Sequence, residues 1–139
     1  MTLLLVVDDE ALIVHVITDA LEDGGFETYE ASSAKEAIAA LNDPTHQFSG
    51  LITDVNLGSE ATGWDVARAA HQGMPDIPVV YMTGDSAHQW AAEGVPHSLL
   101  VQKPFAAAQI TTAIAQLINE AATRKAMLGP LAASPPAES

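Results

Sequence analysis

Short apolar runs alternate along this chain with longer segments in which apolar residues recur at helical spacing. The apolar runs cover residues 3–7, 26–30, 51–53, 79–82 and 99–102. Their length and their content of Val, Ile and Leu are typical of buried strands. Because successive parallel strands need a crossover connection, strands that alternate with helices favour a parallel α/β sheet.

The segments between these runs predict helices. We expect one over residues 10–24, a second over 33–41, a third over 64–71, a fourth between Gly84 and Gly94, and a last over 106–124. Ser33 and Glu36 have the spacing of a capping box, and Ser86 and Gln89 repeat it in the fourth segment. Glycine at the end of the first and fourth segments predicts where those helices stop.

The length of the chain fits one folded domain, since single domains most often run to about 100–150 residues. We assign residues 1–124 to that domain. The chain then reads "LAASPPAES" after Gly129 and Pro130, with too little apolar bulk to offset the entropy of ordering it. We therefore expect residues 125–139 to form a flexible tail.

The charge of the chain narrows its partners. Eighteen Asp and Glu stand against five Lys and Arg, for a formal net charge of −13. Nucleic-acid binding needs a basic patch, so we expect a protein partner and no DNA. The apolar run after Met1 is too short for a signal peptide or a membrane span, which favours a complete small cytoplasmic protein with no membrane contact. We expect a monomer or a weak dimer.

Polar side chains follow most of the predicted strands, at the point where each strand ends. They are Asp8, Asp9 and Glu10 after the first strand, Asp54 after the third, Thr83 after the fourth and Lys103 after the fifth. In an open parallel sheet, ligands bind beyond the carboxyl ends of the strands. We therefore expect these side chains to meet at one edge of the sheet.

This set of side chains suits a phosphoryl group held between a metal ion and a lysine. Carboxylates that converge repel each other unless a cation joins them, and Mg²⁺ prefers oxygen ligands. Lys103 would neutralise the phosphoryl oxygens from the other side, and the Thr83 hydroxyl would donate a hydrogen bond to them. Taken singly, Asp9 or Asp54 is as readily a helix cap, Thr83 a turn residue and Lys103 a solvated strand end. Taken together, they favour a site.

At these residues the sequence resembles the receiver domain of two-component response regulators. The matching stretches are "VVDDE", "LITDVNL", "VVYMTG" and "VQKPF", and the resemblance extends over residues 3–124. It implies a flavodoxin-like, doubly wound (βα)₅ sandwich with a five-stranded parallel sheet in the order 2-1-3-4-5. Because the length of the chain leaves no room for a second folded domain, we expect a single-domain response regulator that switches or relays a signal through protein contacts.

The resemblance further implies a role for each site residue. Asp54 would accept a phosphoryl group from a sensor histidine kinase or a histidine phosphotransfer protein, and Lys103 would pair with the phosphoryl oxygens. Thr83 would report the phosphoryl group to a downstream protein target. The peptide bond between Lys103 and Pro104 would be cis. The Mg²⁺ ligands would be Asp8, Asp9, Asp54 and the backbone carbonyl of Asn56.

Three features depart from the family pattern. Three residues before the lysine, the family usually has Tyr or Phe, which swings inward when the threonine moves. Here that position is Leu100, so the switch would have to rely on repacking of a leucine. The loop "NLGSEATG" lacks a proline common in the family and has about one extra residue before Gly63. Gly84 stands where alanine is commoner, which leaves open space beside the site.

Two other functions compete with this interpretation. A phosphorylation-independent adaptor would keep the fold and never use a phosphoryl group; Leu100 favours it and the complete polar set opposes it. An aspartyl-nucleophile phosphatase of the haloacid-dehalogenase kind needs a general acid two residues after its nucleophile, where this chain has Asn56, which cannot transfer a proton. We therefore expect a phosphoacceptor switch that catalyses only its own phosphorylation and dephosphorylation.

Overall fold

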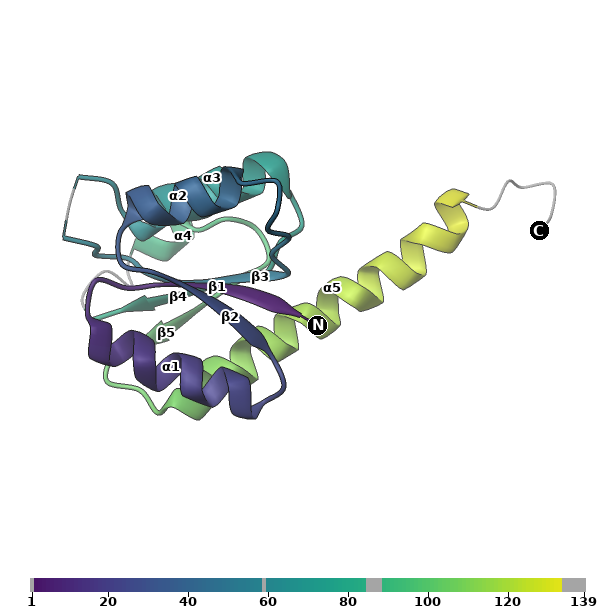
Figure 1. Ribbon diagram of the computed structural model, residues 1–139. Coiled ribbons are helices and arrows are strands. Elements are labelled where there is room, and N and C mark those ends of the chain that lie inside the picture. The colour runs from purple at the N-terminus through teal and green to yellow at the C-terminus, as the bar shows by residue number, and fades with distance from the viewer. Residues whose placement is uncertain (1, 59, 85–88, 134–139) are drawn as a thin grey trace.

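The computed structural model contains one parallel sheet of five strands in the order β2-β1-β3-β4-β5 (Figure 1). The strands are β1 (Leu3–Val7), β2 (Glu27–Ala31), β3 (Gly50–Asp54), β4 (Val79–Thr83) and β5 (Ser98–Gln102). The structure describes residues 2–58, 60–84 and 89–133, with the backbone alone for residues 128–133. The predicted fold class and strand order are confirmed.

Helices cover both faces of the sheet. Figure 1 shows α1 (Ala11–Asp23) and α5 (Ala107–Ala133) on one face, with α2 (Ala34–Asn42), α3 (Gly63–Gly73) and α4 (Trp90–Glu93) on the other. Side chains of a strand point alternately to its two faces. In β1, Leu4 and Val6 therefore join the core under α1 and α5, whereas Leu5 and Val7 join the core under α2 and α3.

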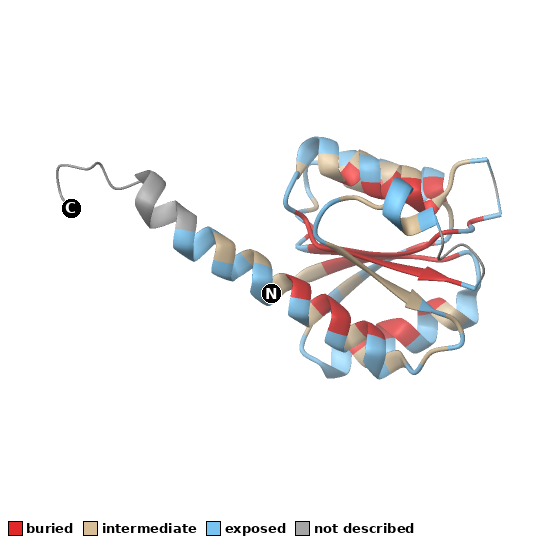
Figure 2. Ribbon diagram, turned by 180° about the vertical axis from the view of Figure 1, so that it is seen from behind, coloured by how far each residue is buried: buried red, intermediate tan, exposed pale blue. Residues whose placement is uncertain are grey.

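The central strands explain why the sequence reads as short continuous apolar runs. Every residue of β3 and β4 is buried, as expected for strands covered on both faces (Figure 2). Both strands extend by one residue past the predicted ends, so that Asp54 and Thr83 are the last residues of β3 and β4. Their side chains are therefore fixed by the sheet ladder itself rather than by a loop.

Two helix starts follow the capping chemistry of the sequence. The Ser33 hydroxyl accepts the Glu36 N–H, as the spacing predicts. Thr62 and Asp65 form a full capping box at the start of α3. The capping pair predicted for the fourth helix includes Ser86, which lies outside the described residues. Within the described part of that segment, α4 ends just before Gly94.

The last helix is longer than predicted. We expected it to end near residue 124, but α5 continues to Ala133, so residues 125–133 of the predicted tail are helical. Ala, Lys, Met and Leu dominate this stretch and are strong helix formers, so the helix continues beyond the apolar stripe on which the prediction rested. The end of α5 projects away from the sheet, with residues 125–127 exposed (Figures 1 and 2). Residues 134–139 lie outside the described part.

No helix among the described residues is long and apolar enough to cross a membrane.

Candidate functional site

The carboxyl ends of the strands bring the predicted polar side chains together. In the sheet register, Val7 of β1 lies opposite Thr53 of β3, so the residues that follow them, Asp8 and Asp54, are neighbours. Thr83 lies opposite Gln102 of β5, which places Lys103 one step beyond the strand pair. The parallel sheet thus collects residues that are far apart in the sequence at one edge.

Lys103 is the centre of this cluster. Its Nζ donates a hydrogen bond to Asp54 Oδ2 at 3.2 Å, and lies 3.6 Å from Glu10 Oε1 and 3.8 Å from Asp8 Oδ2. Burial lowers the pKa of the Lys103 ammonium, but attraction from Asp54 and Asp8 outweighs burial and leaves that pKa above its usual value. Lys103 is therefore a fixed positive charge at the edge of the sheet.

Asp8 is a fully buried carboxylate with an incomplete set of partners. Its Oδ1 accepts the backbone N–H of Glu10 at 2.9 Å, whereas its buried Oδ2 has no hydrogen-bond partner. Burial raises the pKa of Asp8 to about 6, and the nearby charge of Asp54 adds to that rise. Asp8 is therefore still largely charged at neutral pH, and a further cation beside its Oδ2 would lower the cost of burying that charge.

Asp54 is buried as well, and its pKa is also raised. Burial is the main cause, opposed by the Lys103 ammonium and by the backbone N–H of Asn56. The Asp54 carboxylate is thus poised between a cation on one side and acidic neighbours on the other. Its oxygens face a cleft of about 480 Å³ lined by Asp9, Glu10, Asp54, Asn56, Gly58, Gly84 and Lys103.

The acidic residues of the cleft fit a divalent metal ion. One carboxylate oxygen from each of Asp8, Asp9, Glu10 and Asp54 can be chosen so that all lie within 4.8 Å of one another. Mg²⁺ prefers oxygen ligands in proteins, and Asp8 Oδ2, which has no hydrogen-bond partner, is such a ligand. Asn56, whose backbone carbonyl was the other predicted ligand, is exposed and lines the same cleft.

Two glycines of the β3–α3 connection shape the site from behind. Gly58 has a φ of 71°, which favours glycine, and a Cβ there would lie 3.0 Å from Asp9 Oδ2. A Cβ on Gly63 would overlap the backbone carbonyl of Asp54. Gly63 also donates its N–H to the Val55 carbonyl at 2.8 Å, which closes the loop against the end of β3.

Thr83 and Lys103 are joined through the backbone. The Lys103 N–H donates to the Thr83 carbonyl at 2.7 Å, and the peptide bond between Lys103 and Pro104 is cis. Thr83 is 1% exposed. Leu100 lies farther back on β5, opposite Tyr81, and packs on the core under α2 and α3.

Sequence reasoning named Glu10 at the strand end but assigned it no role. The structure places its carboxylate beside Lys103, where it competes with Asp54 for the ammonium. The only signal in the sequence was its position directly after Asp8 and Asp9. The roles of Gly58 and Gly63 were also missed, because they depend on how closely the loop approaches the two aspartates.

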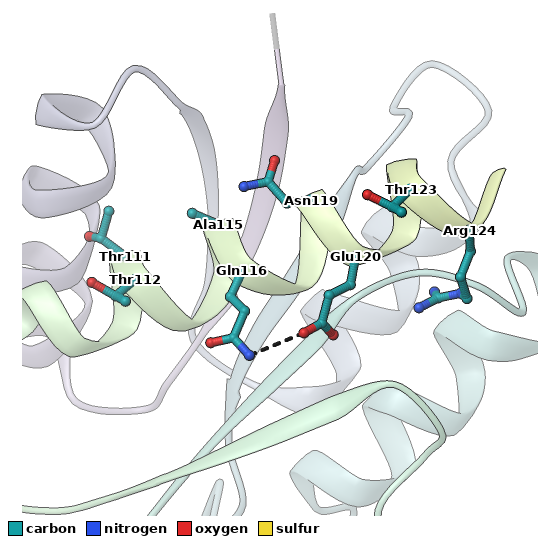
Figure 3. Close-up of a pocket in the computed structure, with 8 residues that line it drawn as sticks. All are labelled: Thr111, Thr112, Ala115, Gln116, Asn119, Glu120, Thr123 and Arg124. Carbon is teal, nitrogen blue, oxygen red and sulfur yellow. Dashed lines mark hydrogen bonds between the residues drawn. The ribbon is translucent and has the colours of Figure 1, made fainter. Parts of the chain in front are cut away.

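A larger hollow of about 850 Å³ runs beside α5 and does not belong to this site (Figure 3). Its lining comes from that single helix, from Thr111 to Arg124, and the Gln116 amide donates to Glu120 at 3.1 Å along it. A hollow bounded by one helix is a surface groove, and it holds none of the acidic residues of the cleft.

Comparisons with known proteins agree with this geometry. The sequence model of the response regulator receiver domain family matches residues 4–115 of this chain. The chain is 34% identical over 87 residues to the heme response regulator HssR of Staphylococcus saprophyticus, covering 63% of this chain and 37% of HssR. It is 30% identical over 115 residues to the photosynthetic apparatus regulatory protein RegA of Rhodovulum sulfidophilum, covering 80% of this chain and 60% of RegA. The chain thus spans less than two thirds of either relative.

A solved structure extends the likeness over most of both chains. The response regulator receiver protein from Sinorhizobium medicae is 38% identical, with a TM-score of 0.83, and the match covers 86% of this chain and 96% of that one.

Proposed function

The chain belongs to the response regulator receiver domain family of two-component systems, and we propose that it accepts a phosphoryl group on Asp54 and signals through protein contacts. The observation that carries the proposal is the Lys103 ammonium, held 3.2 Å from Asp54 Oδ2 at the edge of an acidic cleft. Receiver domains are phosphoacceptor switches rather than enzymes that turn over a substrate, and we propose the same here.

The proposed reaction transfers a phosphoryl group from a histidine nitrogen to a carboxylate oxygen. One oxygen of Asp54 attacks phosphorus, the P–N bond breaks, and its electron pair stays on the imidazole of the donor. The product is an acyl phosphate on Asp54. Lys103 remains protonated and pairs with the phosphoryl oxygens, and the Thr83 hydroxyl donates a hydrogen bond to one of them.

The acidic residues of the cleft prepare it for a metal ion. Asp8, Asp9, Asp54 and the backbone carbonyl of Asn56 would hold Mg²⁺, and when bound it would neutralise charge on the transferring phosphoryl group. Asp8 Oδ2, which has no hydrogen-bond partner, would then have a second cation beside it in addition to Lys103, and this would lower the cost of burying its charge.

The proposed phosphoryl donor is a sensor histidine kinase or a histidine phosphotransfer protein. Leu12 and Val16 of α1, one and two turns beyond the acidic cluster, are 74% and 44% exposed, which supports a protein as donor. The proposal also includes a downstream protein target and the lack of a nucleic-acid partner. It further includes a single domain over residues 1–124, a monomer or weak dimer, and a cytoplasmic location.

One observation favours a second function, that of an adaptor which never uses the phosphoryl group. Leu100 cannot supply the aromatic ring that the family resemblance implies for the switch. The buried Asp54 and its bond to Lys103 favour the phosphoacceptor instead, since an adaptor has no need to bury these charges together.

Labelling by acetyl phosphate separates the two functions. We expect Mg²⁺-dependent addition of one phosphoryl group, seen by intact-protein mass spectrometry, and its loss in Asp54→Asn. Asp43→Asn, a change at an aspartate outside the cleft, is the matched control and should label as the wild type does. Labelling that persists in Asp54→Asn would reject Asp54 as the acceptor, and a wild type that never labels would favour the adaptor.

A further inference from the structure

Tyr81 lies directly across from Leu100 on the neighbouring strand. Its side chain is fully buried, and its ring packs on Trp64 with the two ring centroids 4.5 Å apart. The Tyr81 hydroxyl accepts the backbone N–H of Val95 at 3.1 Å. A buried tyrosine hydroxyl needs a hydrogen-bond partner, so this bond fixes the backbone beyond α4 to the centre of the sheet.

Further bonds continue outward from Val95 to the surface. The Trp90 indole N–H donates to Ser98 Oγ at 2.9 Å, and that hydroxyl donates to the Val95 carbonyl at 2.7 Å. Gly94 lets the chain turn under the indole, because a Cβ there would overlap the Trp90 ring. The Tyr81 hydroxyl is therefore one link between β4 and the described part of the α4–β5 segment, residues 89–98, in which Trp90 and Val95 also pack on the core under α2 and α3.

A second fastening runs to α3 and is weaker. Arg68 donates to Glu93 Oε1 at 3.1 Å and also pairs with Asp65 at 2.8 Å. All three side chains are partly solvated, so these ion pairs contribute little to holding the segment. The partly buried hydrogen bond from the Val95 N–H to the Tyr81 hydroxyl is the stronger of the two restraints.

Tyr81 is also close to the proposed phosphoryl site. Tyr81 and Thr83 are two residues apart on β4, so their side chains leave the strand on the same face. Gly84 leaves space next to them, since a Cβ there would meet nothing within 4 Å. A movement of Thr83 toward the cleft therefore takes place beside the residue that holds Val95.

We propose that the hydroxyl of Tyr81, in place of a ring at position 100, transmits the state of Asp54 to the α4–β5 segment, through its hydrogen bond to the Val95 N–H. The inference rests on the proposed function. Without a phosphoryl group, Tyr81 holds the segment against β4. When Thr83 moves to the phosphoryl group, the Tyr81–Val95 bond loosens and Trp90 and its neighbours change position. Leu100 has no polar atom and cannot make this bond itself.

The test uses the variant Tyr81→Phe, which keeps the ring on Trp64 and removes only the hydroxyl. Amide NMR follows the full chain before and after Mg²⁺ with beryllofluoride, which mimics an aspartyl phosphate. In the wild type we expect shifts both around Asp54 and in residues 89–98. In Tyr81→Phe we expect the shifts around Asp54 to remain and those of residues 89–98 to be largely lost, because the segment is already released.

The chain offers a matched control in its other tyrosine. Tyr29 on β2 packs on His46 and Phe48, away from the cleft, so Tyr29→Phe should keep the whole response. A Tyr81→Phe protein that keeps the full response in residues 89–98 overturns the inference. A wild type with no shifts around Asp54 instead overturns the proposed function, and the inference with it.

A second measurement needs no variant. Loss of one net hydrogen bond changes the balance between held and released states by about fivefold. We therefore expect hydrogen exchange of the Val95 amide in the wild type to become about fivefold faster with beryllofluoride. An unchanged exchange rate at Val95, with beryllofluoride bound at Asp54, contradicts the inference.

Discussion

At the scale of single residues, Asp8 is a buried carboxylate whose charge is only partly compensated. Its carboxylate is fully buried, has one oxygen without a hydrogen bond, and has a pKa raised to about 6. The folded protein without metal therefore binds a proton at Asp8 more tightly than the unfolded chain does. Between about pH 4 and pH 6, folding takes up this proton, so the contribution of Asp8 to stability improves as the pH falls.

We predict that Asp8→Asn stabilises the metal-free protein at neutral pH. Above pH 6 the wild type must bury a charge that Lys103, 3.8 Å away, compensates only in part, and the variant does not, so the free energy of unfolding of the variant should be higher by about 1–3 kcal/mol. Urea denaturation in chelator at several pH values measures the difference. The difference should shrink as the pH falls from 7 to 4, as Asp8 takes up its proton, and saturating Mg²⁺ should reduce it in the wild type's favour.

Asp65→Asn provides a control of opposite sign. Hydrogen bonds from the Thr62 N–H and the Arg68 guanidinium lower the pKa of Asp65, so its charge stabilises the fold. Removing that charge should destabilise the protein at neutral pH. If Asp8→Asn is as destabilising as Asp65→Asn in chelator, then the buried charge of Asp8 is compensated and our account of it is wrong.

The sequence predicted which residues gather at the site but not how they pair. Asp8, Asp54, Thr83 and Lys103 follow from strand ends, because parallel strands end at the same edge. The sharing of Lys103 among Asp54, Glu10 and Asp8 depends on the torsions of a long side chain, which leave no periodic trace in the sequence. The raised pKa of Asp8 depends on burial by neighbours from other strands, for the same reason.

At the scale of elements, the junction of β3 and α3 has almost no free space. Gly63 is the first residue of α3, and a Cβ there would overlap the Asp54 carbonyl and lie 3.0 Å from Thr53 Oγ1. We predict that Gly63→Ala lowers the free energy of unfolding by about 1–3 kcal/mol, because backbone atoms must shift to admit the methyl group. It should also slow acetyl phosphate labelling, since Asp54 is displaced.

Gly73, the last residue of the same helix, is the matched control. A Cβ there would meet nothing within 4 Å, so Gly73→Ala should leave labelling unchanged and raise stability by about 0.4–1 kcal/mol. Urea denaturation and labelling rates of the two variants, side by side, check both statements. Equal effects of the two substitutions would show that the junction has more room than the structure gives it.

Element boundaries were predicted less well than element order. The helix that begins after Ser33 follows from its capping residues, and the central strand β3 follows from its apolar pattern, because both signals act locally. The last residues of β3 and β4 are polar, so the pattern ended them one residue early, although the neighbouring strands continue the ladder through Asp54 and Thr83. Tertiary pairing overrides composition at such positions.

At the scale of the whole molecule, we expect the first part of α5 to contribute most of the stability that this helix gives to the fold. The buried side chains of this helix, among the residues described, are Ile110, Ala113, Ile114 and Leu117. Beyond Arg124 the helix continues, and residues 125–127 are exposed. We predict that a chain ending at residue 124 keeps its free energy of unfolding within about 0.5 kcal/mol and still labels at Asp54, while circular dichroism shows less helix.

A shorter chain ending at residue 116 is the control, because it loses the buried side chain of Leu117 and should be destabilised by about 2–5 kcal/mol. A marked loss of stability already at residue 124 would mean that the end of α5 packs on the domain. The sequence could not predict this projection, because an exposed helical stretch such as residues 125–127 differs from a tail only in helix propensity, and Gly129 and Pro130 favour a tail.

The projecting end makes α5 a lever. With 27 residues the helix is about 40 Å long, and its buried side chains, among the residues described, all lie in its first half, which packs on the sheet. A tilt of about 10° at the clamp would sweep its far end through several ångströms, and each added or removed residue would turn that end by about 100° about the axis. A small change in the tilt of α5 on the domain would therefore become a larger displacement at its far end, where a bound partner would be moved with it.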